Sequence, residues 1–469
     1  MYSPSPRYQY SNEKPLLAAA GGARSVIAWI AAALIAVCVI SPVLTASGAI
    51  DAVNTGSRGE LETTPLRTIG YIIRESAYLI LGFFGCVMLF IRNNWRTFAF
   101  PGAILIALIL IKDLVTYGNL DWAPYGLRPL LVAASVATVS TLLKWNCRRQ
   151  LRLVELTIKA LIAILIPITA HQLVTLSPVF GATFIGPRTL GFWPNPIIYS
   201  MALASFALYL SVARSRHLAA WLVACALLAL TTGGRSGLLA ISLLIGTLAA
   251  RRLGLTNVSL RATPLIALLT PIIAIVAAAG LFAFFSQQRF SGREGTESEN
   301  YGNPRAAYVA ESVLKMADEG GVVALLFGNR LGDGTNALFS SGRSSVISDN
   351  FFLMVIRSYG FLGLLLFSIV AFFWLRRLNI DRISVALVGF SFMMAQSFLE
   401  QHPVAILTLA AAALSARQAS GRPASLRSLP QLGPNRTSRF QPPQQDEAAP
   451  SAPIRSFGLG RKANLSYRN

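Results

Sequence analysis

Three arginines lie where apolar segments of the chain meet polar ones, and they are well suited to bind an anionic group. Arg188 follows a Gly-Pro pair, Arg235 follows a Gly-Gly pair, and Arg305 follows an Asn-Pro pair. The guanidinium group is a planar fork that stays charged and can bind two oxygens of a phosphate or carboxylate at once. These arginines therefore indicate oxyanion binding at places where the backbone turns.

A second candidate is the pair Asp349 and Asn350, which directly precedes the apolar segment 351–374. The Asp349 carboxylate could act as a general base or orient a hydroxyl group. The pair could equally cap the first amides of a helix over 351–374. Both roles fit the position, and the sequence leaves the choice open. Arg357, farther along the segment, either lines the same pocket or extends its guanidinium to the membrane surface.

These residues belong to a chain with the composition of a membrane protein. Of its 469 residues, 54% are hydrophobic and 13% are charged, and the mean hydropathy is +0.55. Its apolar runs are roughly as long as the ~20 residues that cross a membrane as a helix, and a lipid-exposed helix satisfies its own backbone hydrogen bonds. Alternating strands of ~10 residues, typical of a barrel, are not seen. We predict an all-α, polytopic bundle of about twelve spans: 26–48, 71–91, 98–117, 127–144, 153–176, 194–213, 218–232, 236–250, 264–285, 351–374, 383–400 and 403–416.

The distribution of basic residues predicts the orientation of the bundle, because lysine and arginine in short loops favour the cytoplasmic side. With the N-terminus inside, basic clusters such as 144–152 and 251–261 also lie inside. The predicted organisation is a cytoplasmic segment 1–25, transmembrane helices over 26–285, a large periplasmic loop 286–349, transmembrane helices over 350–416 and a cytoplasmic tail 417–469.

The net charge of +21 follows largely from this topology and from the tail 417–469, which is basic and rich in proline, serine and glutamine. Such a composition predicts a disordered tail that is attracted to anionic membrane lipid or docks a partner. No RNA- or DNA-binding module is visible, so we do not expect nucleic acid as a partner. The spacing of the cysteines suggests no metal site, and we expect neither a metal nor a cofactor.

Two local patterns would position the arginines. Asn303 and Pro304 predict the start of a helix over 305–319, with Gly320-Gly321 as its stop and an irregular stretch over 327–348.

Arg235 lies between two apolar runs, 218–232 and 236–250, that are both short for a full crossing. We interpret this as a break between two helices that faces a water-filled pocket. A tight turn with a solvated arginine is the alternative.

Other charged residues fall within predicted spans, including Lys112 with Asp113 and Glu155 with Lys159. Charges at membrane depth face a cavity or a partner. Glu155 and Lys159 are four residues apart and share a helix face. We expect structural pairing or snorkelling for these four residues.

Residues 180–375 resemble the bacterial superfamily of O-antigen ligases and O-antigen or exopolysaccharide polymerases, which are integral-membrane glycosyltransferases. Four pieces carry the resemblance, in the family's order: Gly186 to Pro196 (GPRTLGFWPNP), Leu230 to Leu239 (LTTGGRSGLL), Asn303-Pro304-Arg305 with Phe327 to Gly332 (FGNRLG), and Asp349-Asn350 followed by Gly360 to Gly363 (GFLG).

The chain departs from the family's pattern at two positions. Gly234 stands where the family usually has serine, and Asp349 stands where a histidine is typical of ligases. The resemblance therefore favours a polymerase. It implies that the substrate is an oligosaccharide linked to polyprenyl (undecaprenyl) pyrophosphate at the periplasmic face of the cell inner membrane.

In that reading Arg235 and Arg305 stabilise the departing pyrophosphate without a metal, Asp349 activates or orients the acceptor hydroxyl, and the substrate is bound by Arg188, Asn350 and Arg357. Membrane lipid surrounds the enzyme, and a chain-length regulator and a flippase are possible partners. A ligase that transfers glycan to another acceptor is the nearest alternative. A lipid-linked sugar transporter or flippase is the second, although transporters seldom need so large an outer loop.

Overall fold

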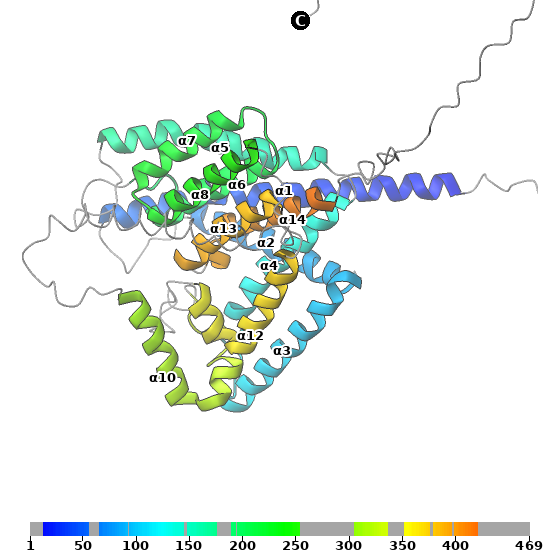
Figure 1. Ribbon diagram of the computed structural model, residues 1–469, viewed down its shortest axis with the longest axis vertical. Helices are drawn as coiled ribbons and strands as arrows, with labels where there is room; N and C mark the ends of the chain where they lie inside the picture. Colours follow the sequence, from blue (N-terminus) through cyan, green and yellow to red (C-terminus); the bar gives the residue numbers. More distant parts are fainter. Residues whose placement is uncertain are drawn as a thin grey trace, which may run out of the picture. The chain divides into compact units, whose positions relative to one another are not determined.

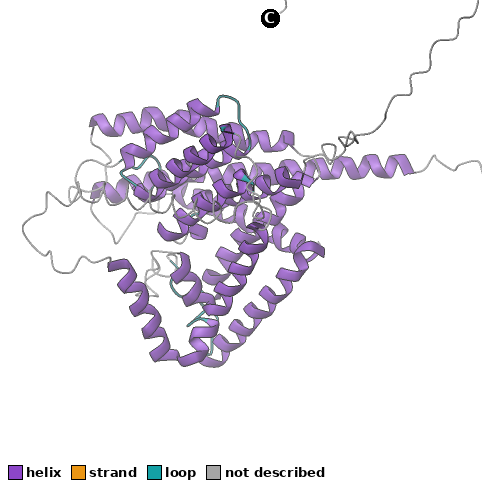
Figure 2. Cartoon of the chain, in the orientation of Figure 1, coloured by secondary structure: helices purple, strands orange, loops and turns teal. Residues whose placement is uncertain are grey.

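The computed structural model describes most of the apolar part of the chain, and the regular elements described there are helices (Figures 1 and 2). This confirms the predicted all-α class for the described part. The segment 264–285, half of the predicted outer loop (286–303 and 336–349) and the tail after 420 lie outside it. The structure describes residues 13–55, 65–91, 93–144, 148–175, 189–193, 195–253, 304–335, 351–375, 379–395 and 398–420.

Each predicted span that falls within the described residues contains a helix. α1 extends beyond its predicted span at both ends, and α13 stops earlier than predicted, with a separate 3-10 turn, η2, after it. The elements are α1 (Glu13–Thr55), α2 (Pro65–Ile91), α3 (Asn93–Tyr117), α4 (Ala123–Lys144), α5 (Arg148–Thr175), α6 (Pro196–Val212), α7 (Leu218–Thr232), α8 (Arg235–Arg252), α10 (Pro304–Phe327), α12 (Phe351–Leu375), α13 (Ile380–Ala395), η2 (Phe398–Glu400) and α14 (His402–Ser420).

Six helices in the described part are long and apolar enough to cross a membrane, namely α1, α2, α3, α4, α5 and α12. Shorter apolar helices are α6, α7 and the stretch Pro403–Ala416 of α14. Large apolar side chains stay exposed on the long helices, for example Phe83 at 66%, Val115 at 81% and Val174 at 84%. Extended apolar exposure of this kind suits helices whose solvent is lipid. The chain therefore has the helices of a membrane protein.

Helix α6 forms the centre of one group of helices. All of its residues from Tyr199 to Val212 are at most 2% exposed, and it packs against α7, α8 and α14. A helix that is apolar on every side is stable only when it is buried. Asn195 fixes its start, because the side-chain oxygen accepts a hydrogen bond of 2.8 Å from the Ile197 amide and Pro196 occupies the first turn.

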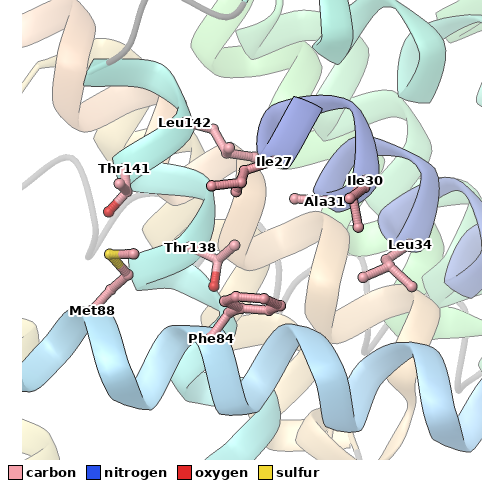
Figure 3. Close-up of a pocket in the computed structure, with 9 residues that line it drawn as sticks. All are labelled: Ile27, Ile30, Ala31, Leu34, Phe84, Met88, Thr138, Thr141 and Leu142. Carbon is pink, nitrogen blue, oxygen red and sulfur yellow. The ribbon is translucent and has the colours of Figure 1, made fainter. Parts of the chain in front are cut away.

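Small residues bring α2 and α4 into close contact. A Cβ atom added at Gly82 would lie 2.8 Å from the Cβ atom of Leu131, and one added at Gly85 would overlap the backbone of Ala134. Small residues allow this close approach of helices within membranes. A cavity of about 50 Å³ remains between α1, α2 and α4 (Figure 3). It has no charged side chain in its lining, so it offers nothing that would bind an anion.

The predicted stop of the outer-loop helix at Gly320-Gly321 is present, because the backbone is not helical at Gly321. Gly321 adopts φ 59° and ψ −156°, which kinks the chain, and helical structure then continues to Phe327. The continuation is favoured because Ala324 after the kink packs with Met316 before it and with Ile356 of α12. The glycine pair therefore ends the first helical segment of α10, and a second, shorter segment follows it to Phe327.

Candidate functional site

The chain that begins at Thr189 contacts the end of α7 at Thr231. The Thr189 amide donates a hydrogen bond of 3.2 Å to the Thr231 carbonyl, and the hydroxyl groups of the two threonines are 2.7 Å apart. Thr189 directly follows Arg188, and Thr231 lies four residues before Arg235. The contact therefore brings the described segment that begins at Thr189 next to the end of α7, just before the break that carries Arg235.

Gln172 of α5 holds the segment after Thr189. Its side-chain oxygen accepts hydrogen bonds from the amides of Leu190 (3.2 Å) and Gly191 (3.0 Å), and its amide group donates to the Gly191 carbonyl (3.2 Å). Sequence reasoning missed Gln172, although a glutamine within an apolar span was a usable signal. Trp193 continues the segment and stacks on Tyr199, with ring centroids 5.0 Å apart.

The predicted break before Arg235 is present. α7 ends at Thr232, Gly233 adopts the left-handed conformation with φ 60°, and α8 begins at Arg235. The backbone needs glycine at 234, because an added Cβ atom would lie 2.6 Å from the Cβ atom of Ser200 in α6. Arg235 stands in the first turn of α8 and is partly buried.

The pieces 327–332 and 360–363 also come together. The Asn329 amide donates a hydrogen bond of 2.8 Å to the Arg357 carbonyl, and a Cβ atom at Gly328 would lie 2.7 Å from that same oxygen. Gly360 kinks α12 with φ 69° and ψ −173°, and its Cα faces the backbone of Leu326. Gly328 and Gly360 both have positive φ angles, which glycine adopts without strain. They allow the end of α10 and the chain after it to cross α12 in backbone contact.

We expect Gly360→Ala to destabilise the protein by about 2–3 kcal/mol, since this backbone region is nearly restricted to glycine and the new methyl group would collide with the chain at 326–327. Thermal unfolding in detergent measures the change. Gly321→Ala is a matched control: its φ is similar, but a Cβ atom there meets nothing within 4 Å. Gly246→Ala, in the open interior of α8, should be neutral or stabilising. Equal losses for Gly360→Ala and Gly321→Ala would mean that the crossing contact contributes nothing.

Arg357 lies in a buried network and does not extend to the surface. It is 7% exposed, and its guanidinium donates to Asp333 at 2.7 Å and to the Ser312 hydroxyl at 2.8 Å. Asp333 is 2% exposed, and its backbone carbonyl accepts a hydrogen bond from the Ser358 hydroxyl. The network ties α10, the loop after it and α12 together. The Nε atom of Arg357 is buried without a hydrogen-bond partner.

Lys112 and Asp113 of α3 hold the same loop. The Lys112 ammonium donates to the carbonyls of Gly328 and Asn329, both at 2.7 Å, and Asp113 accepts a hydrogen bond of 2.7 Å from the Leu331 amide. The two side chains also pair with each other at 3.1 Å. The expected structural pairing fits these contacts, because both charges are satisfied by each other and by backbone groups of the loop 328–331.

Helix α4 supports the loop from another side. Gly126 accepts a hydrogen bond from the Tyr359 hydroxyl at 2.5 Å. Gly332 packs against the backbone of Gly126 at a distance that leaves no room for a Cβ atom. Arg330 lies over the rings of Tyr117 and Trp122 at 4.7 and 4.4 Å. The loop 328–335 is thus positioned by α3, α4, α10 and α12.

The other predicted pair, Glu155 with Lys159, is also present at 2.7 Å, and Glu155 accepts a further hydrogen bond from Ser215. This links α5 to the turn between α6 and α7.

The predicted site residues are described to different extents. Arg235 and Arg357 are placed with their side chains, as above. Arg305 lies in the first turn of α10, and only its backbone is described. Arg188, Asp349 and Asn350 lie outside the described residues. Convergence of the arginines on one pocket therefore stays a prediction.

The described contacts form two groups, which we call the α7–α8 cluster (189–193, Gln172, Ser200 and 231–237) and the α10–α12 cluster (Lys112, Asp113, Ser312, 328–335 and 357–360). α13 packs against α6, α8 and α12 and so connects the helices of both clusters. Sequence reasoning missed Ser312 and Asp333 as members, because both lie in the polar loop where such residues are common.

Among the described residues, no three histidine, cysteine, aspartate or glutamate side chains gather closely enough to hold a metal ion. No protein-family model matches the sequence, and no curated protein matches it closely enough to indicate a relationship.

Proposed function

We propose that the protein is a polysaccharide polymerase of the cell inner membrane, with about twelve spans, cytoplasmic termini and a periplasmic active site. Its substrates are oligosaccharide repeat units linked to polyprenyl pyrophosphate. The observation that carries the proposal is the contact between Thr189 and Thr231. It supports an arrangement in which Arg188 and Arg235 lie near each other at a helix break.

The proposed reaction is a glycosyl transfer. The bond between the anomeric carbon of the donor glycan and its pyrophosphate oxygen breaks, and a bond to an acceptor hydroxyl forms. Arg235 and Arg305 stabilise the negative charge of the departing polyprenyl pyrophosphate, to which arginine binds bidentately. The hydroxyl proton passes to Asp349. The growing chain is thereby transferred as a block to the non-reducing end of a new lipid-linked unit.

The α10–α12 cluster supports this assignment through position. Ser312 lies about two helical turns after Arg305 in α10, and its hydroxyl accepts a hydrogen bond from Arg357. Arg357 belongs to α12, which directly follows Asn350 in the sequence. Arg305 stands in the first turn of α10, Asp349 and Asn350 directly precede α12 in the sequence, and the hydrogen bond between Ser312 and Arg357 links the two helices. Two helix starts of this kind are suited to bind an anion and a hydroxyl group side by side.

Deletion of the gene distinguishes the candidate activities. Loss of a polymerase should leave single repeat units on the carrier lipid, whereas loss of a ligase should leave long chains stranded there. A transporter is tested with the purified protein in liposomes that carry lipid-linked repeats on the accessible face. If the repeats are elongated but not moved across the membrane, the protein is not a transporter. If the repeats are moved across the membrane but not elongated, the protein is not a polymerase.

A further inference from the structure

An apolar groove runs along the surface between α5 and α7 and ends at the α7–α8 cluster. Its volume is about 350 Å³, compared with about 50 Å³ for the cavity between α1, α2 and α4. Side chains from two helices form it: Ile166, Thr169, Ala170 and Leu173 from α5, and Ala220, Val223, Ala224, Leu227, Leu228 and Thr231 from α7. Only the two threonines in this lining are polar.

Both threonines belong to the hydrogen-bond network of the candidate site. Thr231 pairs with Thr189, and Thr169 is 2.9 Å from the hydroxyl of Tyr199, on which Trp193 stacks. The groove is therefore continuous with the helix break that carries Arg235, one turn beyond Thr231.

The groove is open to the surroundings of the helices. Val223 is 57% exposed, Leu227 is 59% exposed and Ile166 is 48% exposed. α5 is one of the helices long and apolar enough to cross a membrane. An occupant can thus enter sideways from the lipid and needs no opening toward water.

We propose that this groove holds the polyprenyl chain of the lipid-linked substrate next to its pyrophosphate. The inference rests on the proposed function, because the substrate class comes from there. In a polyprenyl pyrophosphate the anion is bonded directly to the apolar chain, so an anion site and an apolar groove must adjoin. A cavity of roughly 150 Å³ holds one benzene ring, so the groove has room for at least two isoprene units. Burial of their methyl and methylene groups supplies affinity without polar contacts.

The first test is a kinetic one in proteoliposomes. Ala224→Trp fills the groove and should raise the KM for a lipid-linked repeat with a full-length chain on the order of tenfold, with little change in kcat. A repeat on a short, water-soluble chain of two isoprene units should show a smaller rise in KM, because it has fewer apolar contacts with the groove to lose. Ala219→Trp is the matched control, since Ala219 lies exposed on α7 outside the groove lining, and it should leave the KM unchanged.

A second test does not depend on activity. The probe is polyprenyl pyrophosphate with a photoreactive group in its third isoprene unit. It should label peptides that contain 166–173 or 220–231, and Ala224→Trp should reduce this labelling while Ala219→Trp does not. Excess polyprenyl phosphate should compete with the label, and excess phosphatidylglycerol should not.

The outcomes separate the two proposals. Elongation by the wild type together with labelling outside both helices, or a KM unaffected by Ala224→Trp, would overturn the groove and leave the polymerase standing. Labelling that phosphatidylglycerol displaces equally well would also overturn it, because the groove would then hold bulk lipid. Specific labelling without elongation would retain the groove and contradict the polymerase.

Discussion

Replacing Arg357 with methionine is expected to destabilise the protein by about 3–5 kcal/mol, because removal of one partner from a buried ion pair leaves the other charge uncompensated. The charge left behind is Asp333, which is 2% exposed. Arg357 also donates to Ser312, so the same substitution removes a hydrogen bond between α10 and α12. Chemical unfolding of the purified protein in detergent, followed by tryptophan fluorescence, measures the effect.

Two control variants test whether the loss of stability comes from breaking the buried ion pair or simply from removing a positive charge. The double variant Arg357→Met with Asp333→Leu should recover most of the loss, since apolar residues can replace a buried ion pair at little cost. Lys315→Met breaks the exposed pair with Glu319, whose side chains are 68% and 57% exposed, and should cost less than about 1 kcal/mol. If the single Arg357 variant is as mild as Lys315→Met, the network does not hold the two helices together.

Hydropathy and local turn chemistry were sufficient to predict most of the helices. The break at 233–234 followed from two short apolar runs around a glycine pair, and the span that contains α6 followed from the apolar run at 194–213. Each of these features depends on residues that are close together in the sequence. The glycine pair at 320–321 was also predicted correctly as the end of a helical segment. The second segment of α10, up to Phe327, was not predicted, because it depends on the packing of Ala324 with Ile356 of α12.

The contacts that build the candidate site are long-range, and the sequence alone could not give them. Lys112 and Asp113 were expected either to pair structurally or to snorkel, and they pair. Their contacts with the loop at 328–331 join residues more than two hundred positions apart. Gln172 was visible only as a polar residue in an apolar span. The need for glycine at 234 depends on Ser200 of another helix, which no local pattern reveals.

The largest effect on activity is expected for Arg235. Lysine keeps the charge but lacks the planar fork that binds two oxygens of one phosphate. Loss of one such donor to a developing negative charge lowers the rate on the order of 10²–10³. Arg235→Lys should therefore be nearly inactive, while its unfolding temperature stays close to that of the wild type because Arg235 stands at the partly exposed start of α8. Arg214→Lys, in the exposed turn after α6, is the matched control and should retain wild-type activity.

The most direct measurement is the elongation rate of a defined repeat linked to polyprenyl pyrophosphate by purified wild-type and Arg235→Lys protein in liposomes. Product lengths are scored on gels over time. A wild type that forms long chains, beside a folded variant slower by about two to three orders of magnitude, is the result that a guanidinium-bound leaving group requires. Equal chain lengths and rates for the two proteins would contradict it.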